Sequence, residues 1–76
     1  PYYEIIRDTL ARNLAEGRLP AGTRLQAAAL AERLSVSRSP VKRALELLAG
    51  EGRIVATGGQ GYAVPPLAGA PVRRPG

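Results

Sequence analysis

Two short helical patterns separated by only two residues limit the possible folds of this chain more than any other feature. Residues 27–34 and 37–51 both repeat apolar side chains with the period of an α-helix. Only Ser35 and Val36 stand between them, so the second helix must start at a sharp angle to the first. The apolar positions that would face each other are Leu30, Leu34, Val36, Val41 and Leu45. This spacing predicts a helix-turn-helix.

The second pattern has two faces. Ser37 suits the N-cap position, and Pro40 falls in the first turn, where its missing N–H is harmless. At about 100° per residue, one half of the helix is apolar and the other is mostly charged. The apolar half holds Pro40, Val41, Ala44, Leu45, Leu47 and Leu48, and the polar half holds Arg38, Ser39, Lys42, Arg43 and Glu46.

The positive charges of the polar half gather in the first two turns, ahead of Glu46. A helix with a basic, hydroxyl-bearing N-terminal end and an apolar back has the features needed to enter a DNA major groove. A basic face that is merely solvated would have the same composition. This helix alone leaves both interpretations open, and its neighbours must decide between them.

The composition excludes several classes of function. The chain of 76 residues has no cysteine and no histidine, so we expect no disulfide, no metal site and no His-based catalytic group. Six carboxylates remain as candidate catalysts, which argues against an enzyme, and nothing indicates a cofactor. Because Phe, Trp and Met are also absent, the core must be a thin one of Leu, Ile, Val and Ala.

The charge favours a polyanionic partner. The formal net charge is +5 and the pI is near 10.8, which points to nucleic acid before membrane. The sequence contains neither an apolar run of about 18 residues nor a charged-then-apolar leader, so we expect a cytoplasmic protein that does not span a membrane. Since the sequence begins with Pro1 and not with an initiating Met, we expect it to be a piece of a longer protein.

The N-terminal third predicts a supporting helix and a short strand. Residues 2–16 have a helical apolar stripe of Ile6, Leu10 and Leu14, widened by Tyr3 and Ile5. We expect Asp8 and Arg12 to pair across one turn on the outside and Gly17 to end the helix in the left-handed conformation. We expect Arg7 and Arg12 to be solvated, with a phosphate contact by either as the alternative. Residues 19–22 favour a type I turn, and residues 23–25 a strand that pairs with a later hairpin.

The C-terminal third predicts a hairpin and a tail. Residues 53–57 and 62–64 suit strands, joined by a glycine-rich turn at 58–61 that lacks the helix and Lys-Ser/Thr pair of a P-loop. Residues 67–76 are rich in Pro, Ala and Gly, which indicates a linker or tail. The predicted fold is mostly α with a small β-hairpin, a winged helix-turn-helix over residues 1–66 with three helices, a short strand and a two-stranded wing.

Several spaced motifs together resemble the N-terminal DNA-binding domain of the GntR family of bacterial transcription regulators. They are Gly17-Arg-Leu-Pro-Ala-Gly-Thr-Arg-Leu25, Leu30-Ala-Glu-Arg-Leu-Ser-Val-Ser-Arg-Ser-Pro-Val-Lys-Arg-Ala-Leu45, Leu48, Glu51-Gly52 and Gly59-Gln-Gly-Tyr-Ala-Val64. The resemblance implies a domain that binds a palindromic operator as a homodimer, normally followed by a C-terminal effector domain that senses a small molecule. The position of Pro40 and the short spacing between Leu25 and Leu30 resemble the branch of the family whose effector domain is all helical.

The resemblance also implies which residues contact DNA. The family's serine-arginine pair corresponds to Ser37 and Arg38, and Lys42 replaces an arginine that could read guanine bidentately. Residues 27–29 are alanines where relatives commonly carry glutamate, and Arg43 adds a charge at a commonly acidic position. The predicted DNA-binding residues are Ser37, Arg38, Ser39, Lys42, Arg43, Gly59, Gln60 and Gly61.

We therefore expect a DNA-binding domain of a transcription regulator, a repressor, with the helix over 37–51 in the major groove. The wing turn at 58–61 would lie at the minor groove or the DNA backbone. Two alternatives have the same fold: a winged-helix module that binds another protein, and a non-specific nucleic-acid binder. We expect this chain to be monomeric in solution and to pair only on DNA.

Overall fold

Three helices and a small antiparallel sheet make up the fold, which a computed structural model describes for residues 2–59 and 61–66. Along the chain the elements are α1 (Tyr2–Ala15), β1 (Arg24–Leu25), α2 (Ala27–Leu34), α3 (Arg38–Gly50), β2 (Val55–Ala56) and β3 (Tyr62–Ala63). The fold class is the predicted one, with helices dominant and a wing formed by β2 and β3.

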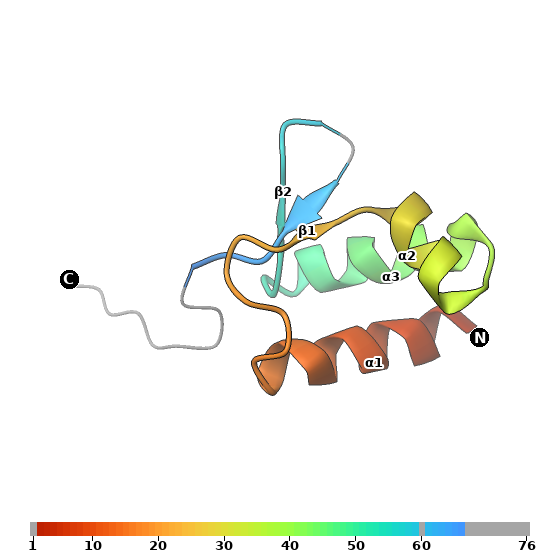
Figure 1. Ribbon diagram of the computed structural model, residues 1–76, viewed down its shortest axis with the longest axis horizontal. Coiled ribbons are helices and arrows are strands. Elements are labelled where there is room, and N and C mark those ends of the chain that lie inside the picture. Colours follow the sequence, from red (N-terminus) through yellow and green to blue (C-terminus); the bar gives the residue numbers. More distant parts are fainter. Residues whose placement is uncertain (1, 60, 67–76) are drawn as a thin grey trace.

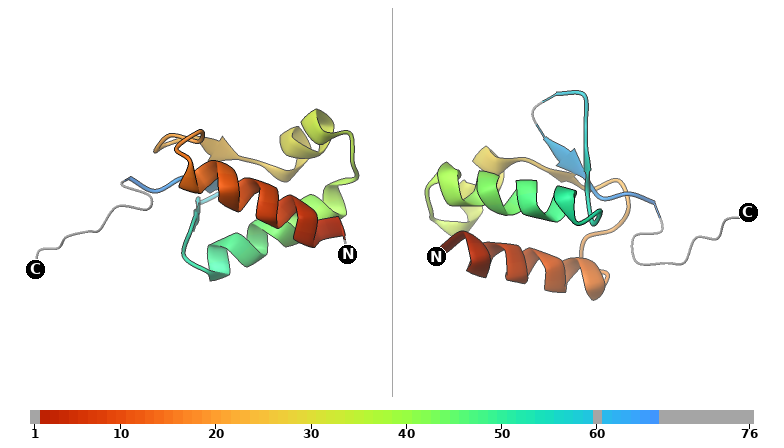
Figure 2. Two further views of the ribbon diagram at one scale, coloured as in Figure 1. Left: turned by 90° about the horizontal axis from the view of Figure 1, so that it is seen from below. Right: turned by 180° about the vertical axis from the view of Figure 1, so that it is seen from behind.

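α3 occupies the middle of the molecule. It packs along α1 on one side, and α2 packs against it near its N-terminal end (Figures 1 and 2). The sheet has the order β1-β3-β2, with Tyr62 of β3 opposite Leu25 on one side and Ala56 on the other. The chain that follows β2, at residues 57–59, projects away from the helices, as Figure 1 shows. This projection makes the hairpin a wing.

The core is aliphatic, as the composition predicts. Eleven buried apolar residues form one cluster, and it contains no aromatic side chain among the described residues. The cluster consists of Ile6, Leu10, Leu14, Leu25, Ala31, Val41, Ala44, Leu45, Leu48, Ile54 and Val64. All three helices, β1 and the residues beside β2 and β3 contribute to it.

The helix-turn-helix connection is closed by local backbone geometry. Ser35 adopts the left-handed conformation with φ of 59°, and the N–H of Val36 donates to the carbonyl oxygen of Ala31 at 3.0 Å. These features end α2 and redirect the chain into α3 within two residues. α2 begins and ends where the sequence predicts, and Gly17, with φ of 76°, follows the end of α1 in the predicted left-handed conformation.

Two apolar residues assigned to buried faces are instead exposed. The exposed fraction is 60% for Ile5 and 41% for Leu34. Ile5 precedes the buried stripe of α1 by one residue, so it points about 100° away from Ile6. Leu34 is the last residue of α2, and the turn at Ser35 leads the chain away before another element covers it.

The predicted turn and ion pair of the N-terminal third are also wrong. The N–H of Thr23 donates to the carbonyl oxygen of Pro20, and Gly22 has φ of 89°, so the turn starts one residue later and is type II. Asp8 pairs with Arg7 at 2.6 Å and not with Arg12. Arg7, expected to be solvated, also contacts Glu51, 44 positions away in the sequence.

Two predicted features lie outside the described residues, namely Gln60 of the wing turn and the tail over 67–76. Within residues 2–59 and 61–66, no helix combines the length and apolar character that crossing a bilayer requires.

Candidate nucleic-acid interface

α3 presents its polar half to solvent because its apolar half is held by the core. Val41, Ala44, Leu45 and Leu48 are buried, with exposed fractions of 1% or less. This fixes the rotation of the helix about its axis, so Arg38, Ser39 and Lys42 are exposed. The division into a buried back and an exposed front is the one that the sequence predicts.

Ser37 is the N-cap of α3, as predicted, but it does not cap with its side chain. Its backbone is extended, with φ of −71° and ψ of 161°, and its hydroxyl makes no capping hydrogen bond. The first turn of α3 also contains no acidic residue. The backbone N–H groups of this turn and the Ser37 hydroxyl are therefore available to an anion.

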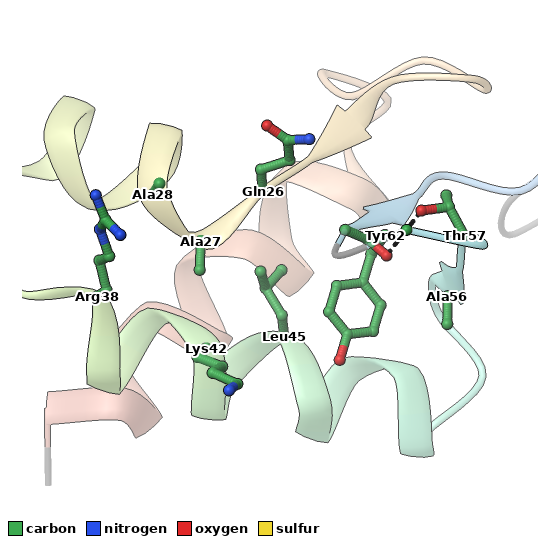
Figure 3. Close-up of a pocket in the computed structure, with 11 residues that line it drawn as sticks. Gln26, Ala27, Ala28, Arg38, Lys42, Leu45, Ala56, Thr57 and Tyr62 are labelled. Carbon is green, nitrogen blue, oxygen red and sulfur yellow. Dashed lines mark hydrogen bonds between the residues drawn. The ribbon is translucent and has the colours of Figure 1, made fainter.

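A cleft separates α3 from the wing, and we call it the α3–wing cleft. Its volume is about 570 Å³. It is lined by Gln26, Ala27, Ala28, Arg38, Lys42, Leu45, Ala56, Thr57, Gly59, Gly61 and Tyr62. Four predicted site residues, two from α3 and two from the wing, thus lie around one hollow (Figure 3).

The α3–wing cleft is electropositive. Its lining contains the cations Arg38 and Lys42 and no carboxylate. Neither cation forms an ion pair anywhere in the described part of the chain, whereas Asp8, Glu16 and Glu51 are each paired with an arginine elsewhere. An exposed, unpaired cation loses no internal partner when it binds a phosphate, so the cleft is suited to a polyanion.

Arg43 is separated from the other predicted contacts. Its guanidinium carbon lies 5.5 Å from the ring centroid of Tyr3, a cation–π arrangement that joins α3 to α1. It does not line the α3–wing cleft. Ser37 and Ser39 are likewise outside the lining, at the exposed start of α3.

The two described glycines of the predicted wing contact differ in their surroundings. Gly59 is exposed, with open space where a Cβ would lie. Gly61 is buried, and a Cβ there would lie 3.1 Å from Cγ of Gln26 and 3.2 Å from the carbonyl oxygen of Leu25. A side chain at position 61 would therefore crowd Gln26 and Leu25, whereas Gly59 leaves space for another surface to approach.

Seven cleft residues were not among the predicted contacts, and three of these carry a polar side chain. Tyr62 and Thr57 come from the wing strands and their ends, and Gln26 precedes α2. The Thr57 hydroxyl and backbone N–H both donate to the carbonyl oxygen of Gly61, at 3.1 and 3.0 Å, and close the base of the wing. In the sequence, Thr57 and Tyr62 stand close to the predicted wing glycines, and Tyr62 belongs to the motif over 59–64, whereas nothing marked Gln26. The side of a two-residue strand that faces α3 is set by tertiary packing.

Glu51 and its two arginines form a separate charged cluster outside the α3–wing cleft. Arg7 donates two hydrogen bonds to Glu51, at 2.6 and 2.8 Å, and Arg53 donates a third at 2.9 Å. The hydrogen bonds from Arg7, and then from Arg53, lower the pKa of the Glu51 carboxyl below its ordinary value. This cluster ties α1 to the segment that leads from α3 into the wing.

Comparison with known proteins identifies the family. A family model described as "Bacterial regulatory proteins, gntR family" matches residues 2–64. Among solved structures, E. coli McbR/YncC superposes with a TM-score of 0.84 at 30% identity, covering 88% of this chain and 32% of that one. A search of curated proteins gave no match.

Two further structures are similar. YtrA from Sulfolobus acidocaldarius, described as a GntR-family transcription factor, has a TM-score of 0.77 at 33% identity, with 86% of this chain and 69% of YtrA covered. A GntR family transcriptional regulator from Listeria monocytogenes has a TM-score of 0.77 at 26% identity, with coverages of 86% and 58%. The present chain spans about a third of the E. coli protein. It belongs to the gntR family of bacterial regulatory proteins, as a DNA-binding domain with a winged-helix fold.

Proposed function

We propose that residues 1–66 form a sequence-specific DNA-binding domain that regulates transcription in the bacterial cytoplasm, as a repressor. The first turns of α3 lie in the major groove, and the wing lies at the adjacent minor groove or its backbone. The observation that carries this proposal is that two exposed cations, Arg38 and Lys42, line a cleft without carboxylates and form no ion pair with any described residue.

The side chains of α3 have separate roles in this proposal. Arg38 reads a base edge or holds the phosphate beside it, and Lys42 adds a point charge to the same groove. Ser37 and Ser39 bind phosphates at the helix N-terminus, which the missing side-chain cap of Ser37 supports. Arg43, whose guanidinium lies over the Tyr3 ring, contacts only phosphates at the margin of the site.

The wing contributes through backbone that comes close to DNA. Gly59 has no side chain to limit that approach. Gln60, the next residue in the sequence, is proposed as a further contact. Gly61 supports the wing from inside the protein. The descriptions of the S. acidocaldarius and L. monocytogenes proteins as transcription regulators support the same function for this chain.

We further propose that two copies bind a palindromic operator. A two-fold symmetric DNA site presents the same half-site twice, and each α3 would then occupy one major-groove segment. Sedimentation without DNA should show a monomer, and sedimentation with a two-half-site duplex should show two copies for each duplex. A stable dimer in the absence of DNA would contradict pairing on the operator alone.

Binding measured against salt concentration tests the proposal. A duplex selected by the protein from a randomised pool serves as the probe, and a scrambled duplex of equal length is its control. Because several phosphates are neutralised, the logarithm of affinity should fall linearly and steeply with the logarithm of salt. The selected duplex should bind at least ~10³-fold more tightly than the control.

The two alternatives predict different results in the same titration. A protein-interaction module would show no appreciable affinity for either duplex. A non-specific binder would show the steep salt dependence but equal affinities for the selected and scrambled duplexes.

A further inference from the structure

Tyr62 is the one aromatic residue in the lining of the α3–wing cleft. It belongs to β3, the central strand of the sheet, and is half-buried. Figure 3 shows its ring extending from β3 toward α3, so the hydroxyl lies across the cleft from the strand. Tyr62 therefore carries a polar group into the space between the two proposed DNA-contacting elements.

The Tyr62 hydroxyl makes no hydrogen bond to any residue within 2–59 and 61–66, unlike the neighbouring hydroxyl of Thr57, which donates to the carbonyl oxygen of Gly61. Without such a hydrogen bond, the hydroxyl of a half-buried tyrosine remains able to donate to a ligand. The nearby charge in the lining comes from Lys42 and Arg38, so that ligand should be an oxyanion.

The geometry of a DNA duplex supplies this oxyanion. One sugar–phosphate strand separates each major groove from the adjacent minor groove. If α3 occupies the major groove and the wing the neighbouring minor groove, that strand must cross the space between them. The α3–wing cleft is this space, and neutral donors such as Tyr and Gln commonly contact phosphates along DNA backbones.

We propose that the Tyr62 hydroxyl donates a hydrogen bond to a DNA phosphate in the α3–wing cleft, which Lys42 also lines. This inference rests on the proposed function, because it places the duplex by assuming that α3 and the wing enter adjacent grooves. Tyr62 is thus a contact to the backbone that positions α3 in the major groove without reading base sequence.

The variant Tyr62→Phe removes only the hydroxyl, and Tyr2→Phe on α1 removes the same group outside the cleft. Affinity for the selected duplex should fall roughly tenfold in Tyr62→Phe and stay unchanged in Tyr2→Phe. The loss should be equal for the scrambled duplex, because phosphates carry no sequence information. The salt slope should also be unchanged, whereas Lys42→Gln should reduce it by about 1.

Replacing single phosphates of the selected duplex by neutral methylphosphonates locates the contact. At one position, the replacement should weaken DNA binding by the wild-type protein and have a much smaller effect on binding by Tyr62→Phe. The inference is overturned if Tyr62→Phe binds as tightly as wild type, if it changes the preference between duplexes, or if its thermal unfolding midpoint falls, which would show an internal role for the hydroxyl. Failure of the wild-type protein to bind any duplex would instead contradict the proposed function.

Discussion

At the scale of single residues, the exposed cations of α3 are not equivalent. Arg38 lines the α3–wing cleft without an ion-pair partner in the described chain, whereas Arg43 rests over Tyr3. The sequence places both on the polar half of one helix, and only the packing of α1 distinguishes them. Arg38 is therefore available to DNA, and Arg43 already has an intramolecular partner.

Replacing each arginine by alanine should separate these roles. Arg38→Ala should cost about 1 to 3 kcal/mol of binding free energy at the selected duplex and leave thermal stability unchanged. Arg43→Ala should weaken binding less but reduce the free energy of unfolding by about 0.5 to 1 kcal/mol, because it removes the contact to Tyr3. Anisotropy titrations and thermal melts of both variants would measure the two effects. Unchanged affinity in Arg38→Ala would refute its assigned contact.

The wing glycines permit a matched pair of substitutions. Gly61→Ala should lower the free energy of unfolding by about 1 to 3 kcal/mol, because the new methyl meets the Leu25 carbonyl oxygen, which is backbone and cannot easily move. Gly59→Ala meets open space and should change stability by less than about 1 kcal/mol. Urea unfolding of both variants is the measurement, and equal stabilities would contradict the packing role of Gly61.

At the scale of the elements, the sequence predicts periodic features well and long-range contacts poorly. The bounds of α2, the aliphatic core and the winged topology follow from spacing and composition. Helical spacing alone predicted that Asp8 would pair with Arg12. In the structure Asp8 pairs with Arg7, and Arg7 also binds Glu51 because α1 packs along α3. A pattern within one helix cannot show which residue of another helix will lie beside it.

The candidate site divides in the same way. Arg38 and Lys42 could be predicted because they belong to the front of a helix whose back is plainly apolar. The place of Tyr62 could not be predicted, because a two-residue strand has too short a pattern to show which face meets α3. The burial of Gly61 depends on how the segment between β1 and α2 packs over it, which is a tertiary contact.

The Arg7–Glu51 pair gives the fold a pH dependence. The pKa of Glu51 lies below its ordinary value of 4.5, chiefly through the hydrogen bonds from Arg7, so the folded state favours the ionised carboxylate. Its stabilising contribution is present above that ordinary value and is lost as the pH falls through the lowered pKa. Glu51→Gln should therefore melt below wild type at pH 7, and the difference should shrink below about pH 4.5.

A control variant and a salt series make this result specific. Glu32→Gln removes an exposed carboxylate that forms no ion pair in the described chain, and its melting difference from wild type should not follow the same pH curve. Added salt should reduce the wild-type advantage over Glu51→Gln at pH 7, because the ions screen a pair near the surface. If the difference in melting temperature between wild type and Glu51→Gln did not change with pH, the substitution would act on stability through something other than the loss of the ionised carboxylate.

At the scale of the whole molecule, the charges are distributed unevenly. The paired acids Asp8, Glu16 and Glu51 lie outside the α3–wing cleft, and the cleft itself contains only cations among its charged groups. α1 packs against α3 (Figure 1). It contributes no residue to the cleft lining. A duplex bound at the cleft would therefore contact α3 and the wing while the outer face of α1 remains solvated.

Amide chemical-shift mapping of the isotope-labelled protein, titrated with its selected duplex, tests this placement most directly. The largest shifts should fall on the first turns of α3, from Arg38 to Lys42, and on the wing at Gly59 and Tyr62. Amides on the outer face of α1, such as those of Glu4 and Asp8, should barely move. The largest shifts on α1, with α3 and the wing unaffected, would contradict the proposed interface.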